Sequence, residues 1–177
     1  MTEYDAVVYD LDNTLVRLAV DWDAVSDACA AVLRERDVEP GADLWVMLEQ
    51  AATRGCRDAV EDVIAAHERD GTRESERLPL ADELPLSVPT AICSLNCEAA
   101  CRLALEVHDL AEHVDAVVGR DTVATEKPDP EPLLAAVDSL AADPGRTLFV
   151  GDSERDEATA KHADVPFAYV EEYRATP

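Results

Sequence analysis

The sequence has very little lysine and few aromatic residues. Among its 177 residues, Lys127 and Lys161 are the only lysines, and aromatic residues make up 5%. Fifteen Lys and Arg side chains stand against 39 Asp and Glu, so the formal net charge is −24 at pH 7. A chain this acidic repels nucleic-acid backbones and anionic membrane surfaces. The composition therefore argues against nucleic acids and membranes as partners.

The sequence also lacks an apolar run long enough to cross a membrane, and its first residues lack the charged-then-apolar pattern of a secretory signal. We therefore expect a cytoplasmic protein. The cysteines form an odd set, and three of them recur every fourth residue, a spacing seen in metal clusters. Because Cys93 should end a strand whereas Cys97 and Cys101 should lie on the next helix, we expect buried, reduced thiols instead.

Intrinsic disorder is a common reading of so acidic a chain, but hydrophobic residues make up 47% of it and recur periodically. The acidic residues are therefore expected to coat a folded surface. Excess Asp and Glu with scarce Lys resembles proteins from salt-saturated cytoplasms, where salt screens the repulsion between like charges. We infer a halophilic protein. No feature of the sequence indicates an oligomeric state.

Two predicted strands end in acidic residues, and these residues are the first candidates for a functional site. The apolar stretch Ala6–Asp10 predicts a strand that ends on Asp10 and Asp12. Near the other end of the chain, Thr147–Val150 predicts a second such strand, followed by Gly151, Asp152 and Asp156. Carboxylates gathered in this way are suited to hold a hard cation such as Mg2+.

Two further motifs lie between these strand ends. Ser94 closes the apolar run Val88–Cys93, and Lys127 lies in the proline-stiffened loop Glu126-Lys127-Pro128. In chain order the motifs read Asp-x-Asp-x-Thr, Ser, Lys-Pro and Gly-Asp-x-x-x-Asp. This ordered set resembles the haloacid dehalogenase-like hydrolase superfamily, in its capped, phosphoglycolate phosphatase-like branch. The similarity spans Val7 to Val170.

The resemblance implies a Mg2+-dependent phosphomonoester hydrolase that acts on a small phosphorylated metabolite. Asp10 would be the nucleophile and a metal ligand, and Asp12 the acid and base that also gives its backbone carbonyl to the metal. Lys127 would balance the charge of the phosphate and Asp10. The remaining implied residues are the metal ligands Asp152 and Asp156 and the substrate-binding residues Thr14, Ser94 and Asn96. Asn96 is one residue further along than is usual in relatives, and Asp156 would ligate the metal directly or through water.

Predicted strands alternate with helices, which indicates an α/β fold with a doubly wound parallel sheet. The predicted strands are Ala6–Asp10, Val88–Cys93, Ala116–Val118, Thr147–Val150 and Phe167–Val170, and the resemblance implies the order 5-4-1-2-3. Apolar residues at helical spacing predict core helices over Ala99–Leu110, Leu133–Leu140 and Glu157–Ala163. Asp129 is expected to cap the second of these.

The first two strands lie far apart in the sequence, and the residues between them predict three amphipathic helices, Trp22–Asp37, Leu44–Thr53 and Arg57–Asp70. We interpret residues 19–84 as a small helical cap on a catalytic core formed by residues 1–18 and 85–177. Arg54 and Arg57 are candidates to bind a second anionic group of the substrate, although exposed helix-end arginines are the commoner case.

Three other functions remain as alternatives. A phosphomutase or phosphotransferase on the same scaffold shares the aspartyl-phosphate. A dehalogenase is disfavoured because that branch does not keep the second aspartate, here Asp12. A phosphoacceptor domain of the receiver type also combines acids, Ser or Thr and Lys on a doubly wound sheet. It places the phosphorylated Asp after its third strand and has no cap, whereas the third strand here ends at Val118-Gly119-Arg120.

Overall fold

A parallel five-stranded sheet forms the centre of the computed structural model, which describes residues 4–174. The strands are β1 (Ala6–Tyr9), β4 (Thr90–Cys93), β5 (Ala116–Val118), β6 (Thr147–Gly151) and β7 (Phe167–Tyr169). They lie in the order β5-β4-β1-β6-β7, and all four pairings are parallel. Numbered 1 to 5 along the chain, these five strands lie in the order 3-2-1-4-5, which is the predicted order 5-4-1-2-3 counted from the other edge. The predicted fold class is therefore confirmed.

Strand β1 occupies the middle of the sheet, and all four of its residues are buried. Its register aligns Val8 with Ala91 of β4 on one side and with Phe149 of β6 on the other. Helices cover both faces of a parallel sheet, so its central strands are continuously apolar instead of alternating. The sequence Ala-Val-Val-Tyr meets that requirement.

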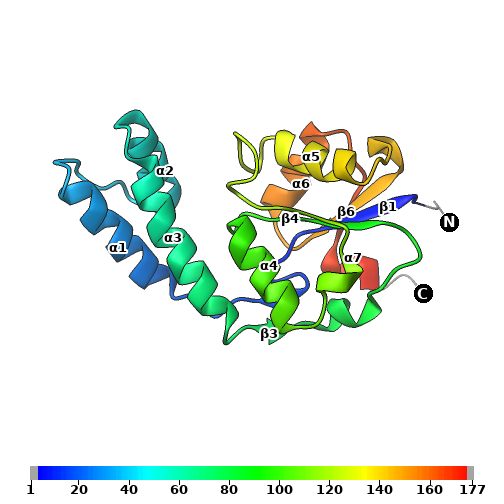
Figure 1. The fold of residues 1–177 in the computed structure, drawn as a ribbon. Helices are drawn as coiled ribbons and strands as arrows, with labels where there is room; N and C mark the ends of the chain where they lie inside the picture. The colour runs from blue at the N-terminus through cyan, green and yellow to red at the C-terminus, as the bar shows by residue number, and fades with distance from the viewer. Residues whose placement is uncertain (1–3, 175–177) are drawn as a thin grey trace.

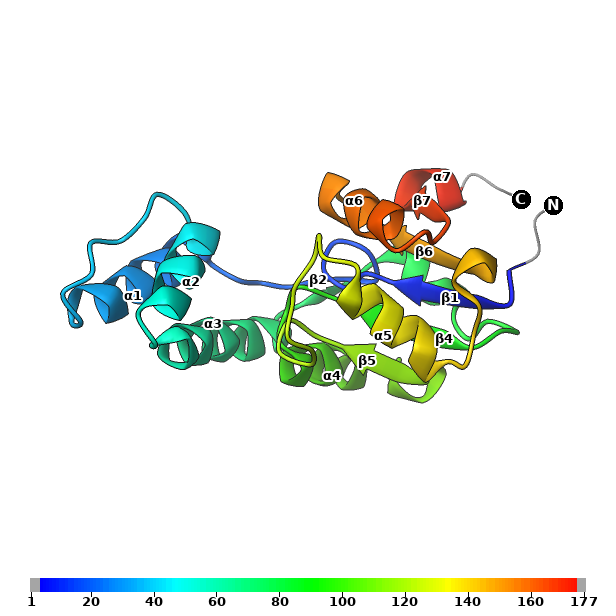
Figure 2. The same cartoon turned by 90° about the horizontal axis from the view of Figure 1, so that it is seen from above.

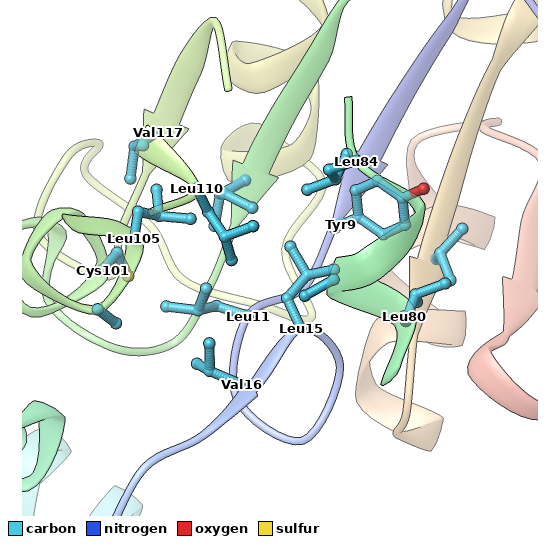
Figure 3. Close-up of a cluster of buried hydrophobic side chains, with 14 of the residues drawn as sticks. Tyr9, Leu11, Leu15, Val16, Leu80, Leu84, Cys101, Leu105, Leu110 and Val117 are labelled. Carbon is cyan, nitrogen blue, oxygen red and sulfur yellow. The ribbon is translucent and has the colours of Figure 1, made fainter. Parts of the chain in front are cut away.

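Helices flank the sheet on both faces (Figure 1). On one face lie α4 (Glu98–Val107) and α7 (Val170–Arg174), and on the other α5 (Glu131–Ser139) and α6 (Glu154–His162). Figure 3 shows part of the first packing layer, in which Leu11 and Leu15 lie near Leu105 and Leu110. The second layer packs Leu133 of α5 and Ala160 of α6 against Phe149.

The predicted ends of the core helices differ from the observed ends by no more than one helical turn. Helix α4 ends before the predicted Leu110, where Asp109 takes a left-handed conformation (φ 55°) that ends helices. Helix α6 begins earlier than predicted because Ser153 caps it, accepting a hydrogen bond from the Asp156 N–H. At α5 the cap residue is Pro130 and not Asp129, although the Asp129 carboxylate accepts from the Glu131 N–H.

Three helices of the predicted cap form a separate lobe beyond one end of the sheet (Figures 1 and 2). They are α1 (Trp22–Arg34), α2 (Leu44–Thr53) and α3 (Arg57–Thr72). Each contributes buried residues to a cluster of its own, including Leu33, Leu48 and Ile64. Asp21 and Asp43 cap α1 and α2 by accepting backbone N–H bonds in their first turns. We refer to residues 22–72 as the helical lobe.

The segments that join the helical lobe to the core contain structure that the sequence did not predict. Strands β2 (Val16–Arg17) and β3 (Glu76–Arg77) pair antiparallel at the base of the lobe. A 3-10 helix, η1 (Pro79–Glu83), follows, and its Leu80 and Ala81 pack in the core cluster. Residues 79–84 therefore pack with the core, although they were assigned to the cap. Two more 3-10 helices are η2 (Ala111–His113) and η3 (Pro144–Arg146).

Most acidic side chains of the described residues are at least partly exposed. The buried ones are Asp10, Glu68 and Asp156. All five cysteines are free thiols, and all except Cys56 are buried. No helix within residues 4–174 combines the length and apolarity needed to span a bilayer.

Candidate active site

The carboxyl ends of three neighbouring strands place the predicted site residues at one edge of the sheet. Asp10 follows β1, Ser94 follows β4 and Asp152 follows β6. The Asp10 N–H donates to Val150 O at 2.9 Å, and the Ser94 N–H donates to Val118 O at 2.9 Å. These bonds extend the sheet ladders up to the functional side chains, so the positions of both residues are set by the rigid part of the fold.

Three carboxylates meet at this edge. One oxygen from each of Asp10, Asp152 and Asp156 lies within 4.8 Å of the others. Gly151 makes this approach possible, because a Cβ at that position would lie 2.7 Å from atoms of the Asp156 side chain. The Asp12 carboxylate is not part of this group, and its Oδ1 accepts from the Leu18 N–H at 2.8 Å.

Lys127 is buried among these carboxylates. Its Nζ donates to Asp10 Oδ1 at 2.8 Å, to Asp156 Oδ1 at 2.5 Å and to Cys93 O at 3.2 Å. An ammonium has three N–H donors, so these bonds use all of them. A charge buried to this extent needs such partners. The Lys-Pro loop therefore places its lysine next to the carboxylates that follow β1 and β6.

The surroundings shift the pKa values of these groups in directions with clear causes. Burial raises the pKa of Asp10 to about 7, although the Lys127 ammonium opposes the shift. Burial lowers the pKa of Lys127, but the attraction of Asp10 and Asp156 outweighs it and the net shift is upward. Burial also raises the pKa of Asp12, against the hydrogen bond from Leu18. Asp12 is thus biased toward its protonated form, as an acid catalyst requires.

The three predicted phosphate-binding residues take different positions. Ser94 and Asn96 both line a cavity at the sheet edge, and the Ser94 hydroxyl donates to Asn96 Oδ1 at 3.1 Å. Asn96 therefore reaches the site, which its shifted position in the sequence had left open. Thr14 is fully buried and is not among the residues that line the cavity, and its hydroxyl donates a long bond of 3.4 Å to Asp10 Oδ2.

The cavity has a volume of about 240 Å³ and lies between the sheet edge and the helical lobe. Asp10, Asp12, Lys127, Asp152 and Asp156 line it on the core side. On the lobe side its lining includes an apolar group that the sequence analysis did not single out, comprising Trp22, Leu44, Trp45, Leu48 and Ile64. Residues of the lobe therefore face the predicted catalytic groups.

A buried ion pair, Glu68 with Arg120, also lines the cavity and was missed. Glu68 belongs to α3 of the lobe, and Arg120 follows β5 of the core. One signal was present in the sequence, because Glu68 continues the buried positions Val60 and Ile64 at a spacing of four residues. A carboxylate on the apolar face of a helix indicates a buried partner.

The two arginines suggested as anion-binding residues lie outside the cavity lining. Arg57 Nη2 donates to Glu61 at 3.0 Å and to Glu126 at 2.9 Å. Arg54 lies beside a different hollow, next to Val38 and Val46. Both positions agree with the commoner case of arginines at helix ends.

Comparison with known proteins identifies the family. A profile described as haloacid dehalogenase-like hydrolase matches residues 82–170. The chain is 34% identical over 188 residues to phosphoglycolate phosphatase of Rhodospirillum rubrum, which covers 91% of this chain and 77% of the relative. The chain belongs to the haloacid dehalogenase-like hydrolase family. The predicted enzyme class, a phosphatase of this family, is thereby confirmed.

Relatives of similar identity carry different substrate names. The chain is 30% identical over 190 residues to N-acetylmuramic acid 6-phosphate phosphatase of Pseudomonas aeruginosa, covering 93% of this chain and 83% of the relative. A solved family hydrolase from Geobacter sulfurreducens superposes with a TM-score of 0.62 at 22% identity, covering 93% of this chain and 85% of that one. Membership of the family thus leaves the substrate to be argued from the cavity.

Proposed function

We propose that this phosphatase is a Mg2+-dependent phosphomonoesterase that acts on a small phosphorylated metabolite through an aspartyl-phosphate on Asp10. The observation that carries the proposal is the placement of Asp10. Its carboxylate lies on the cavity wall, 2.8 Å from a buried ammonium and beside two further carboxylates. A nucleophile, a cation and a metal-binding acid group thus converge on one cavity.

The donor set suits Mg2+. The three clustered oxygens come from carboxylates, which are the hard ligands this ion takes, usually together with water and substrate phosphate. We propose that Asp10 and Asp152 hold the ion with the Asp12 backbone carbonyl. Both Asp156 oxygens already accept bonds, from Lys127 and from Ser153, so Asp156 is better placed to orient Lys127 and a bound water. When bound, Mg2+ would neutralise phosphate charge and hold the phosphate in line.

The residues then divide the reaction into two steps. A carboxylate oxygen of Asp10 attacks phosphorus, the ester P–O bond breaks, and Asp12 gives its proton to the departing alcohol. In the second step Asp12, now ionised, takes a proton from water as the water oxygen attacks phosphorus and the bond to Asp10 breaks. Lys127 balances the negative charge throughout, and the Ser94 hydroxyl and the Asn96 amide are placed to donate to phosphate oxygens.

A screen for phosphate release tests this proposal. Wild-type protein in molar KCl is assayed with a panel of phosphorylated metabolites and 4-nitrophenyl phosphate, with and without Mg2+. We expect Mg2+-dependent release that Asp10→Asn abolishes, because an amide is a poor nucleophile. Asp138→Asn, an exposed change on α5, is the matched control and should retain activity. No release from any ester, or full activity in Asp10→Asn, would refute the proposal.

A further inference from the structure

The wall of the cavity opposite the catalytic carboxylates is apolar and aromatic. It consists of Trp22, Leu44, Trp45, Leu48 and Ile64 from the helical lobe. Trp22 and Trp45 are the only tryptophans in the chain. An indole ring combines a large apolar face with a polar N–H, and 43% of the Trp22 surface is accessible. Both therefore offer ring surface to whatever part of a substrate extends beyond the phosphate.

The cations that line this cavity are already engaged by protein groups. Lys127 has its three bonds to Asp10, Asp156 and Cys93 O. Arg120 is only 4% exposed, and its guanidinium is shared among three acceptors. These acceptors are Glu61 through Nε, Glu68 through Nη1 and Nη2, and Leu95 O through Nη1.

Two other arginines come near the lobe without lining the cavity. Arg57 is held by Glu61 and Glu126. The Arg155 guanidinium stacks over the Trp45 ring, 4.5 Å from its centroid, which is the geometry of a cation–π contact. Neither arginine lines the cavity, and the two cations among the described lining residues, Lys127 and Arg120, are both held in ion pairs.

The lobe side of the cavity carries one charged lining residue, Glu68, and its charge is already paired. Glu68 lines the cavity and is fully buried, held by Arg120, the Cys97 N–H and the Asn96 amide. A substrate carboxylate placed here would lose its water against indole and leucine side chains and would find no lining cation free to pair with it. Burying a carboxylate without a paired cation is strongly unfavourable.

Resting on the phosphatase function proposed above, we propose that the alcohol part of the substrate is uncharged and presents a flat or CH-rich face to Trp22 and Trp45. A sugar or an aromatic ring has this chemistry, whereas glycolate, the leaving group in the name of the Rhodospirillum relative, does not. The apolar wall would thus select against a second anionic group, because that group would be desolvated there without a cation as partner.

Matched substrate pairs test this inference on the wild-type enzyme. Each pair differs chiefly in one carboxylate: glucose 1-phosphate against glucuronic acid 1-phosphate, phenyl phosphate against 4-carboxyphenyl phosphate, and 2-hydroxyethyl phosphate against 2-phosphoglycolate. We expect kcat/KM to be at least tenfold higher for the uncharged member of the first two pairs. The ratio of kcat/KM for glucose 1-phosphate to kcat/KM for phenyl phosphate then shows whether a sugar or an aromatic ring is the better leaving group. Equal or better hydrolysis of the carboxylate members would overturn the inference while leaving the phosphatase function intact.

A positive charge introduced into the apolar wall provides a second test of the same inference. Leu44→Arg, on the first turn of α2, should raise kcat/KM for 2-phosphoglycolate relative to 2-hydroxyethyl phosphate by about tenfold or more. Val46→Arg is the matched control, because Val46 is exposed on the same helix and does not line the cavity. An unchanged ratio in folded Leu44→Arg would count against the inference. If Leu44→Arg does not fold, the wild-type pairs still decide.

Binding can be followed without turnover, since both tryptophans line the site. In Asp10→Asn with Mg2+, phenyl phosphate should quench tryptophan fluorescence at lower concentration than 4-carboxyphenyl phosphate. Trp45→Leu should raise the KM for phenyl phosphate severalfold with a smaller change in kcat, whereas Val46→Leu should change neither. Tighter binding of the carboxylate ligand would overturn the inference, as would an unchanged KM in Trp45→Leu.

Discussion

The carboxylate of Glu68 and the guanidinium of Arg120 form a bidentate ion pair, with bonds of 2.7 Å and 3.2 Å. Glu68 lies on the helical lobe and Arg120 on the core, so this pair joins the two parts of the molecule. The same carboxylate accepts from the Cys97 N–H at 2.9 Å. It therefore also holds the loop after β4, which carries Ser94 and Asn96.

Breaking this pair should destabilise the protein strongly. Glu68→Gln leaves the buried Arg120 charge with Glu61 as its remaining charged partner, and removal of one member of a buried pair costs about 3–5 kcal/mol. We expect a loss of this order in the free energy of unfolding, measured with urea. The exposed Glu74→Gln should cost less than about 0.5 kcal/mol. A similar small loss in Glu68→Gln would show that the pair contributes little.

Metal removal should abolish activity. Clustered carboxylates repel a phosphate dianion, and Lys127 is one positive charge against the three acids, so the group needs a further cation to receive substrate. We expect phosphate release to fall to background after treatment with chelator and to return when Mg2+ is added. Asp152→Asn should weaken Mg2+ binding, seen as a higher Mg2+ concentration for half-maximal activity. Full activity in excess chelator would contradict the metal-dependent mechanism.

Salt should stabilise this protein. The formal charge of −24 arises mostly from acids that are at least partly exposed, and their mutual repulsion is screened over about 3 Å in 1 M salt but about 30 Å in 0.01 M salt. The melting temperature and the activity should both rise as KCl increases from dilute buffer to molar concentration. Sucrose, which carries no charge, controls for general stabilisation by cosolutes. Indifference to KCl would exclude a halophilic adaptation.

The cysteines should differ in reactivity according to burial. Burial raises the pKa of Cys93 to about 12 and those of Cys29 and Cys97 to about 11, and thiolate is the reactive form. Iodoacetamide at pH 8 should therefore modify the half-buried Cys56 first, and all five only after unfolding. Mass spectrometry of native and unfolded samples checks this. Rapid native modification of Cys93 would contradict the structure around Lys127.

The strand ends were predictable from sequence because they are local. An apolar run that stops on Asp10 or Asp152 marks both a strand and its edge, and parallel topology then brings such edges together. The lobe helices were predictable from their periodic apolar faces. By contrast, the two-residue strands β2 and β3 are too short to show an alternation of apolar and polar residues.

The lobe side of the cavity could not be predicted in the same way. Glu68 and Arg120 meet only because α3 lies against the loop after β5, and no local pattern encodes that contact. No local pattern distinguishes Trp22 and Trp45 as cavity residues, and the sequence analysis singled out neither of them. Arg54 and Arg57 were considered because of their charge, yet neighbouring glutamates hold Arg57 and the helix direction takes Arg54 away from the cavity.

The different roles of Asp10 and Asp12 should separate in their asparagine variants. Asp10→Asn should lose turnover on every ester, whereas Asp12→Asn should be selective, because an alkyl alcohol needs a proton to depart and an acidic phenol does not. With 4-nitrophenyl phosphate, Asp12→Asn should give a burst of phenol and then turnover slowed by about 10²–10⁴-fold, since the second step lacks its base. Stopped-flow absorbance measures the burst amplitude.

The pH dependence gives the same assignment an independent check. Burial raises the pKa of Asp12, and the proton needed for the first step is lost as pH rises through that raised value. Ionisation of Asp10 affects both ester classes alike, so ester cleavage should fall with rising pH more steeply for alkyl than for aryl phosphates when single turnovers are measured. Asp12→Asn should remove this difference in slope between the two ester classes. The assignment would be contradicted if Asp12→Asn lost activity equally on alkyl and aryl esters, gave no burst and left the difference in pH slope unchanged. Asp12 would then be a structural residue whose carboxylate only accepts the hydrogen bond from the Leu18 N–H.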